Sequence, residues 1–281
     1  VVMGGAAAGA ASAAGAAVDR GLLLGVEAEV VETPFPDRIP ALVTGRADVI
    51  VASTSDTLER AKTVGMTVPY FAFQMVVLTR EDAGVNSYAD LKGKKIAATK
   101  GTDPYFFLLR SLQANGLTPD DIKIVHLQHP DGRTALDNGQ VNAWSGLDPI
   151  MAAAEVESGD VLFYRNLNFN TYGFLNATEK FIQSNPTAAQ TIVDVYEYAR
   201  AWAKKNPEEA VKIVEEESGI KHETAQVVME RTHLDIDPVP GAKQVEVLKG
   251  VGPILVESGD VPSQSDVDKA LNSIVDDQFA K

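Results

Sequence analysis

The strongest constraint on the fold is a run of five residues, DVIVA at 48–52, which follows a short helical stretch and Gly45. A continuous run of this kind is typical of a strand that is buried on both faces of a sheet. Strands and helices alternate in this way to about residue 145, which predicts an α/β fold with right-handed crossovers. We expect strands at 1–3, 26–32, 48–52, 96–99, 122–127 and 141–144, and helices at 10–24, 38–44, 105–115 and 133–138.

After residue 178 the pattern changes to amphipathic helices that are separated by Asn-Pro or Gly-Ile. We expect these helices at 179–184, 187–205, 207–218, 222–231, 244–258 and 265–279. No low-complexity linker divides the 281 residues, so we expect two lobes joined by crossing strands near 73–79 and 171–175. One lobe would comprise residues 1–75 with 176–281, and the inserted lobe residues 76–175.

Composition excludes several classes of protein. The formal charge of −14 argues against a nucleic-acid partner, because such a protein needs a basic face. The absence of cysteine removes disulfides, thiolate nucleophiles, iron–sulfur clusters and cysteine-bound zinc. His126 and His129 form an H-x-x-H pair, but on a strand-to-loop segment they would not converge on one ion. We therefore expect no metal and no cofactor.

Residues 38–71 carry the most informative motif. It contains, in order, Gly45 after a helix, the buried strand, the loop Ser53-Thr54-Ser55, TLER at 57–60 and Pro69-Tyr70. The motif resembles the signature of extracytoplasmic amino-acid-binding proteins of bacterial ABC importers, and DLKGKK at 90–95 and KGT at 100–102 extend the resemblance. Further along, NAW at 142–144, Asp148-Pro149 and AAAE at 152–155 resemble the nitrate-, sulfonate- and taurine-binding proteins.

Both families share the two-lobed type II periplasmic-binding fold. The resemblance therefore implies two mixed, mostly parallel sheets that are joined by two crossing hinge strands. It also implies a monomeric receptor that closes around a small-molecule ligand and delivers it to an ABC permease in the membrane. Such a protein would be periplasmic, or extracytoplasmic and membrane-anchored, with its signal segment not present in this chain.

In the first lobe, the expected ligand-binding residues are Ser53, Thr54, Ser55 and Arg60. The three hydroxyl residues follow a buried strand and precede a helix, where free amides and the helix dipole favour an anion. The amino-acid-binding family places its carboxylate-binding arginine at the position of Arg60. A guanidinium can donate two parallel hydrogen bonds to a carboxylate. The alternative is a surface ion pair between Arg60 and Glu59 or Asp56.

In the second lobe, Gly101 and Thr102 repeat this strand-to-helix arrangement. Asp148 follows the strand at 141–144, where the family uses an acid to hold the ligand's ammonium; alternatively it caps the helix that starts at Pro149. Asp103 stands where amino-acid binders often carry a small hydroxyl residue. Because a carboxylate beside an anion is unfavourable, we expect Asp103 either to turn outward as a cap or to meet a ligand amine.

Aromatic residues give a weaker indication of the site. Trp144 and Tyr172 are expected beside the ligand, since each adjoins a predicted strand end or crossing, although such residues more often pack in a core. Phe106 and Phe107 are expected in the core.

The expected ligand is a small acidic or zwitterionic solute, an amino acid or a related compound, and the alternative is a sulfonate, taurine or nitrate. Two other functions are disfavoured. A pyrimidine-synthesising enzyme family has the same fold but carries a cysteine-rich motif, and this chain has no cysteine. A regulator's effector domain would need a DNA-binding helix-turn-helix at the N-terminus, which this sequence does not offer.

Overall fold

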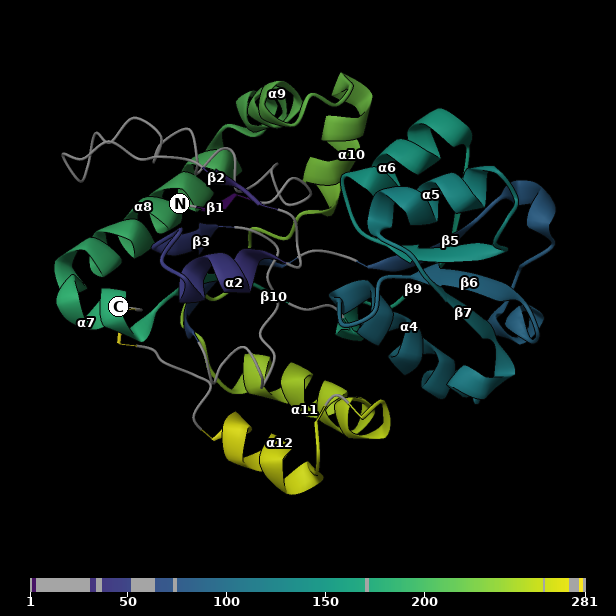
Figure 1. Cartoon of the computed structure of the whole chain (residues 1–281). Coiled ribbons are helices and arrows are strands. Elements are labelled where there is room, and N and C mark those ends of the chain that lie inside the picture. Colours follow the sequence, from purple (N-terminus) through teal and green to yellow (C-terminus); the bar gives the residue numbers. More distant parts are fainter. Residues whose placement is uncertain are drawn as a thin grey trace. The chain divides into compact units, whose positions relative to one another are not determined.

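The computed structural model (Figure 1) describes residues 2–3, 31–33, 37–51, 64–72, 75–169, 172–259, 261–272 and 278–279. The chain divides into two compact units. Unit 1 comprises residues 1–73 and 172–281, and unit 2 comprises residues 74–171. The chain thus passes between the units at 73–74 and again at 171–172, within the two segments where the sequence predicts crossing strands.

Unit 2 is built on a five-stranded sheet with the order β7-β6-β8-β5-β9. Its strands are β5 (Val76–Thr79), β6 (Lys95–Ala98), β7 (Lys123–His126), β8 (Ala143–Gly146) and β9 (Val161–Arg165). Strand β6 runs parallel to β7 and β8, whereas β5 is antiparallel to β8 and β9. The sheet is therefore mixed, as predicted.

Helices cover both faces of this sheet. They are α4 (Asp103–Ala114), α5 (His129–Asp137) and α6 (Ile150–Ala153), the last continued by a π-helical turn, η5 (Ala154–Ser158). In Figure 1, α5 and α6 lie on one face of the sheet and α4 on the other. Along β8, Ser145 faces α4 and donates its hydroxyl to the carbonyl of Pro104 at 2.7 Å, so its neighbours in β8 face α5 and α6.

Trp144 fills the core between β8 and helices α5 and α6. Its side chain is fully buried and belongs to a cluster that includes Leu136 and Met151. Two glycines make room for the indole: an added Cβ would lie 2.7 Å from Trp144 Nε1 at Gly132 and 2.4 Å from Trp144 Cζ2 at Gly146. The packing of this face therefore depends on Trp144 and on the absence of side chains at both glycines.

We expect Gly146→Ala to lower the free energy of unfolding by about 1–3 kcal/mol, because the new methyl group overpacks the core against the Trp144 ring. Urea unfolding measures the change. Gly241→Ala is the control, since a Cβ there has no atom within 4 Å and is expected to have little effect. Equal stability of the parent and Gly146→Ala would contradict the packing described here.

Unit 1 contains a second five-stranded sheet with the order β2-β1-β3-β10-β4. The strands are β1 (Val2–Met3), β2 (Val31–Glu32), β3 (Val49–Val51), β4 (Gly65–Ala72) and β10 (Tyr172–Ala177). Strand β1 is parallel to β2 and β3, and β10 is antiparallel to β3 and β4. Ile50 of β3 packs with Leu42 and Val64, which explains why the strand within the DVIVA run is apolar.

In the described residues of unit 1, the helices are α2 (Arg38–Val43), α7 (Glu179–Ser184), α8 (Pro186–Lys205), α9 (Pro207–Ser218), α10 (His222–Arg231), α11 (Ala242–Glu257) and α12 (Gln264–Leu271). Pro186 and Pro207 each open a helix, where a missing N–H costs nothing. No helix in the described part of the chain is both long and apolar enough to cross a bilayer.

Several expected boundaries are wrong. Helix α5 begins at His129 rather than at residue 133, because Pro130 stands in its first turn. Helix α12 ends at Leu271, short of the expected 265–279, of which 273–277 lie outside the described residues. Strands β4 and β9 are missing from the expected set. The expected helix at 10–24 and most of the strand at 26–32 also lie outside the described residues.

A cluster of charged side chains lies where β9 begins. Arg133 pairs with Glu157 at 2.8 Å and with Asp137 at 3.6 Å. Asp160 is only 6% exposed, and one of its carboxylate oxygens is buried without a hydrogen-bond partner. Burial, reinforced by the negative charge of Asp137, raises the pKa of Asp160 from 3.8 to about 6, although Arg133 and Arg80 oppose this change.

This raised pKa predicts a pH dependence of stability. The folded protein holds the Asp160 proton more tightly than the unfolded chain, so stability falls as the pH rises from about 4 to about 6 and stays lower above it. Asp160→Asn removes the ionised form, and we expect it to stabilise the protein by about 1 kcal/mol at pH 7 and to have no effect near pH 4. Urea unfolding at pH 4 to 8 checks this, with exposed Asp120→Asn as the control. A pH slope that Asp160→Asn leaves intact would contradict the prediction.

Candidate functional site

The candidate site lies at the carboxyl edge of the unit 2 sheet, between β6 and β8. From β6 the chain runs through α4 to β7, which lies on the β6 side of this strand pair. From β8 the chain runs through α6 toward β9, which lies on the β8 side of the pair. The connections therefore diverge between these adjacent parallel strands. A topological switch point of this kind opens a crevice in which open α/β sheets bind ligands. The residues that follow β6 and β8 are Gly101, Thr102 and Asp103, and Asp148, respectively.

Gly101 and Thr102 form the turn from β6 into α4. Gly101 has φ +75°, a left-handed conformation that favours glycine. Thr102 is 1% exposed, and its hydroxyl donates to the carbonyl of Thr99 at 2.6 Å. The hydroxyl proton is therefore used within the turn. What this turn offers a ligand is backbone N–H at the start of α4 rather than a hydroxyl donor.

Asp103 stands in the first turn of α4 and is 6% exposed. The expectation that it turns outward to solvent is thus wrong. A carboxylate in the first turn of a helix is stabilised by the helix dipole. It also places a negative charge where the sequence predicts an anion, so this helix start is less favourable for a second negative group. The expected contact with a ligand amine stays a prediction.

Asp148 precedes the short helix α6, whose N-cap is Pro149. Its Oδ1 accepts a hydrogen bond from the backbone N–H of Ala152 at 2.9 Å, and the peptide bond to Pro149 is cis. The carboxylate therefore satisfies one N–H at the start of α6, although the N-cap position that the sequence predicts for Asp148 falls on Pro149. Since the carboxylate is half-buried at the end of β8, the expected contact with a ligand ammonium stays a prediction beside it.

Two expected pocket aromatics differ in their surroundings. Trp144 is fully buried in the core of unit 2, so we correct its assignment from ligand neighbour to core residue. Tyr172 opens β10 in unit 1, pairs with Ala72 and is half-buried, and this burial raises the pKa of its hydroxyl. Its ligand role stays a prediction. The remaining expected residues, Ser53, Thr54, Ser55 and Arg60, lie outside the described residues.

Thr99 and His129 support the same edge. The sequence reasoning missed Thr99 and considered His129 only as half of an H-x-x-H pair. The Thr99 hydroxyl donates to the carbonyl of Leu127 at 2.7 Å and lies 3.3 Å from His129 Nδ1. These bonds tie the end of β6 to the start of α5. Thr99 is the last residue of a predicted strand, which is the signal that marks it. His129 is buried whereas His126 is exposed, and no cluster of three possible metal ligands occurs among the described residues.

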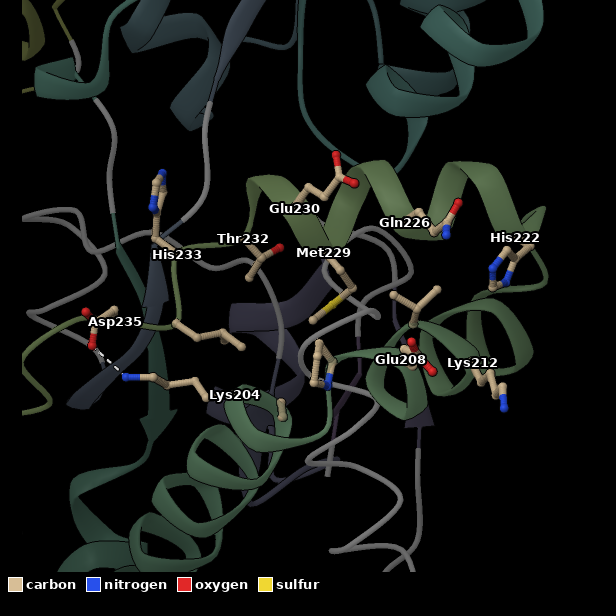
Figure 2. Close-up of a pocket in the computed structure, with 14 residues that line it drawn as sticks. Lys204, Glu208, Lys212, His222, Gln226, Met229, Glu230, Thr232, His233 and Asp235 are labelled. Atoms are coloured by element: carbon tan, nitrogen blue, oxygen red, sulfur yellow. Dashed lines mark hydrogen bonds and ion pairs between the residues drawn. The ribbon is translucent and has the colours of Figure 1, made fainter.

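A cavity of about 710 Å³ lies within unit 1, away from the switch point of the unit 2 sheet (Figure 2). Helices α8, α9 and α10 and the segment that follows α10 surround it, with apolar side chains such as Val211, Met229 and Leu234 and charged groups at the rim. Lys204 pairs with Asp235 at 2.6 Å on this rim. None of the residues that the sequence predicts for ligand binding lines this cavity. We therefore place the candidate site at the switch point.

Comparison with known proteins assigns the family. Residues 25–210 match the model of the family described as NMT1/THI5 like. The chain belongs to this family. A relative from Escherichia coli K12, named as a candidate aliphatic sulfonates-binding protein, is 27% identical over 194 residues, which are 68% of this chain. The matched part spans only 60% of that relative's length.

Structural similarity establishes the fold. The crystal structure of the periplasmic aliphatic sulphonate binding protein SsuA from Escherichia coli superposes with a TM-score of 0.79 at 22% identity. The superposition covers 96% of this chain and 90% of that one, which confirms the type II periplasmic-binding fold. A shorter similarity links the chain to ABC transporter arginine-binding protein 1 of Escherichia coli K12, 26% identical over 134 residues, or 46% of this chain and 55% of that protein. Both resemblances seen in the sequence are thus confirmed.

The hydrogen bond that Asp148 accepts predicts the effect of two substitutions. Asp148→Ala removes the acceptor for the Ala152 N–H and is expected to lower the free energy of unfolding by about 1 kcal/mol. Asp148→Asn keeps an acceptor oxygen, so its stability should stay within about 0.5 kcal/mol of the parent. Urea unfolding of both variants measures the difference. Equal stability of the two variants would show that this hydrogen bond does not hold α6.

Proposed function

We propose that this chain is the solute-binding receptor of an ABC importer, that it is not an enzyme, and that its ligand is a small organic sulfonate. The main support is the similarity to a relative named for aliphatic sulfonates over 68% of the chain. The fold shared with SsuA agrees with this role. Such a receptor would work outside the cytoplasm and deliver its solute to a membrane permease.

A sulfonate spreads one negative charge over three oxygen atoms, so it needs several N–H or O–H donors. In this proposal the hydroxyl loop Ser53, Thr54 and Ser55 and the guanidinium of Arg60 supply them from unit 1. The turn at Gly101 and Thr102, which leads into α4, would supply backbone N–H donors of the helix start from unit 2. A closed form of the two units would bind the ligand more tightly, so ligand binding would shift the population toward this form. The permease would then recognise the closed form.

Two carboxylates at the candidate site bear on the choice of solute. Asp103 and Asp148 follow the ends of β6 and β8 and give this edge negative charge. A ligand with an ammonium group gains attraction there, whereas a plain alkanesulfonate does not. The proposed solute is therefore an aminosulfonate such as 2-aminoethanesulfonate (taurine).

An amino acid is the second candidate. Its carboxylate would bind the same hydrogen-bond donors as a sulfonate, and its ammonium would bind the same carboxylates. The similarity to an arginine-binding protein over 46% of the chain favours this candidate. The two solutes differ in the anionic group, so a direct comparison of sulfonates and carboxylates separates them.

Calorimetry of the purified protein with taurine, ethanesulfonate and β-alanine tests the proposal. We expect taurine to bind about tenfold or more tightly than either analogue, because each analogue lacks one of the two recognised groups. Binding of β-alanine or other amino acids with no binding of any sulfonate would favour the second candidate. Chemical conversion of a bound compound, followed by mass spectrometry, would contradict a purely binding role.

Substitution of Arg60 tests its assignment. Arg60→Ala is expected to weaken taurine binding by about tenfold or more, since the two parallel hydrogen bonds from the guanidinium to the sulfonate are lost. Arg46→Ala, at an exposed arginine of the same unit, is the matched control and should bind as the parent does. Equal affinities of the parent and Arg60→Ala would show that Arg60 is a surface residue only.

A further inference from the structure

Arg110 is a half-buried cation for which the described part of the chain supplies no hydrogen-bond acceptor at Nη1. It lies in α4, and its Nη1 is buried without a hydrogen-bond partner. Among the described residues, none accepts a hydrogen bond from this guanidinium or pairs with it as a carboxylate. Arg80, Arg133 and Arg200, also in the described part, each pair with an acid. Arg110 therefore differs from these arginines in its charge environment.

The ring of Phe169 lies against the guanidinium of Arg110. The central carbon lies over this ring, 4.4 Å from its centroid, which is a cation–π contact. Phe169 belongs to the 3₁₀ turn η6 (Leu167–Phe169), and its ring packs edge-on against Phe107 with centroids 6.2 Å apart. The ring attracts the positive charge, but it does not replace the oxygen acceptors that the N–H donors of a guanidinium bind in the plane of the group.

Burial without a partner is costly for a cation. Desolvation lowers the pKa of the Arg110 guanidinium, but an arginine stays protonated, so the charge persists. A buried donor without an acceptor carries the full cost of its desolvation, and a buried charge carries more. Such groups in structures are often completed by something outside the chain, such as an ordered water, an ion or a ligand. An anion whose oxygen atoms match the planar guanidinium compensates both the charge and the unused donors of Arg110.

We propose that Arg110, held by Phe169, is an oxyanion-binding residue of unit 2 that takes the sulfonate group of the solute in its in-plane N–H donors. The choice of a sulfonate rests on the proposed function; the need for an oxyanion rests on Arg110 itself. Two oxygen atoms of a sulfonate or carboxylate can accept parallel hydrogen bonds from one guanidinium. The assignment also places a positive charge on the helix whose first turn carries Asp103.

Three variants test this inference by calorimetry with taurine and ethanesulfonate and by thermal unfolding without ligand. Arg110→Met keeps a long apolar stem, and we expect it to weaken sulfonate binding by about tenfold or more while the apo protein unfolds at the same or a higher temperature. Arg110→Lys keeps the charge but loses the fork, so its affinity should fall between parent and Arg110→Met. Arg133→Met removes an ion-paired arginine of the same unit and should lower stability without changing affinity.

The outcomes separate this inference from the proposed function. Unchanged sulfonate affinity in Arg110→Met, with a lower unfolding temperature, would overturn the inference and show a structural role only, while the proposed function stands. If the parent protein binds amino acids but no sulfonate, the proposed solute is wrong. In that case a loss of amino-acid binding in Arg110→Met still supports an oxyanion role for Arg110.

Discussion

The divergence of the chain beside β6 and β8 is the constraint on which the rest of the account depends. Because β6 and β8 are adjacent and parallel, their carboxyl ends meet at one edge. Their helices then leave in opposite directions, so neither helix covers that edge. Thr99, Ser145 and Asp148 each use a side-chain hydrogen bond to hold the strand ends and helix starts in place. Fixed backbone of this kind is what a binding site for a small solute requires.

Charge at this edge is local and does not follow the total of −14. Asp103 and Asp148 place two carboxylates in the segments that follow β6 and β8, whereas Arg110, on the same helix as Asp103, pairs with no acid in the described part of the chain. Acidic and basic groups in one unit suit a solute that carries both charges. A receptor can therefore bind an acid although its total charge is negative, because recognition depends on a few buried groups.

The sequence predicted the elements whose signals are local. Asn-Pro steps and the Gly after α9 mark the helices at 179–184, 207–218 and 222–231, and the structure begins and ends them at the same residues. Strand β4 was missed because Gly65 and Pro69 read as turn residues, and its place in the sheet comes from pairing with β10. Trp144 was misassigned because burial on one face of β8 depends on α5 and α6, which no local pattern shows. Arg110 went unnoticed since an arginine inside a helix shows its missing partner only after folding.

Hydrogen exchange with mass spectrometry tests the central claim most directly, because it locates the solute on the chain. With saturating taurine, the account predicts slower amide exchange at 99–106 and 147–152, the two segments that follow β6 and β8, and no change at 203–235 around the unit 1 cavity. Protection that is confined to 203–235 would contradict the placement of the site at the switch point.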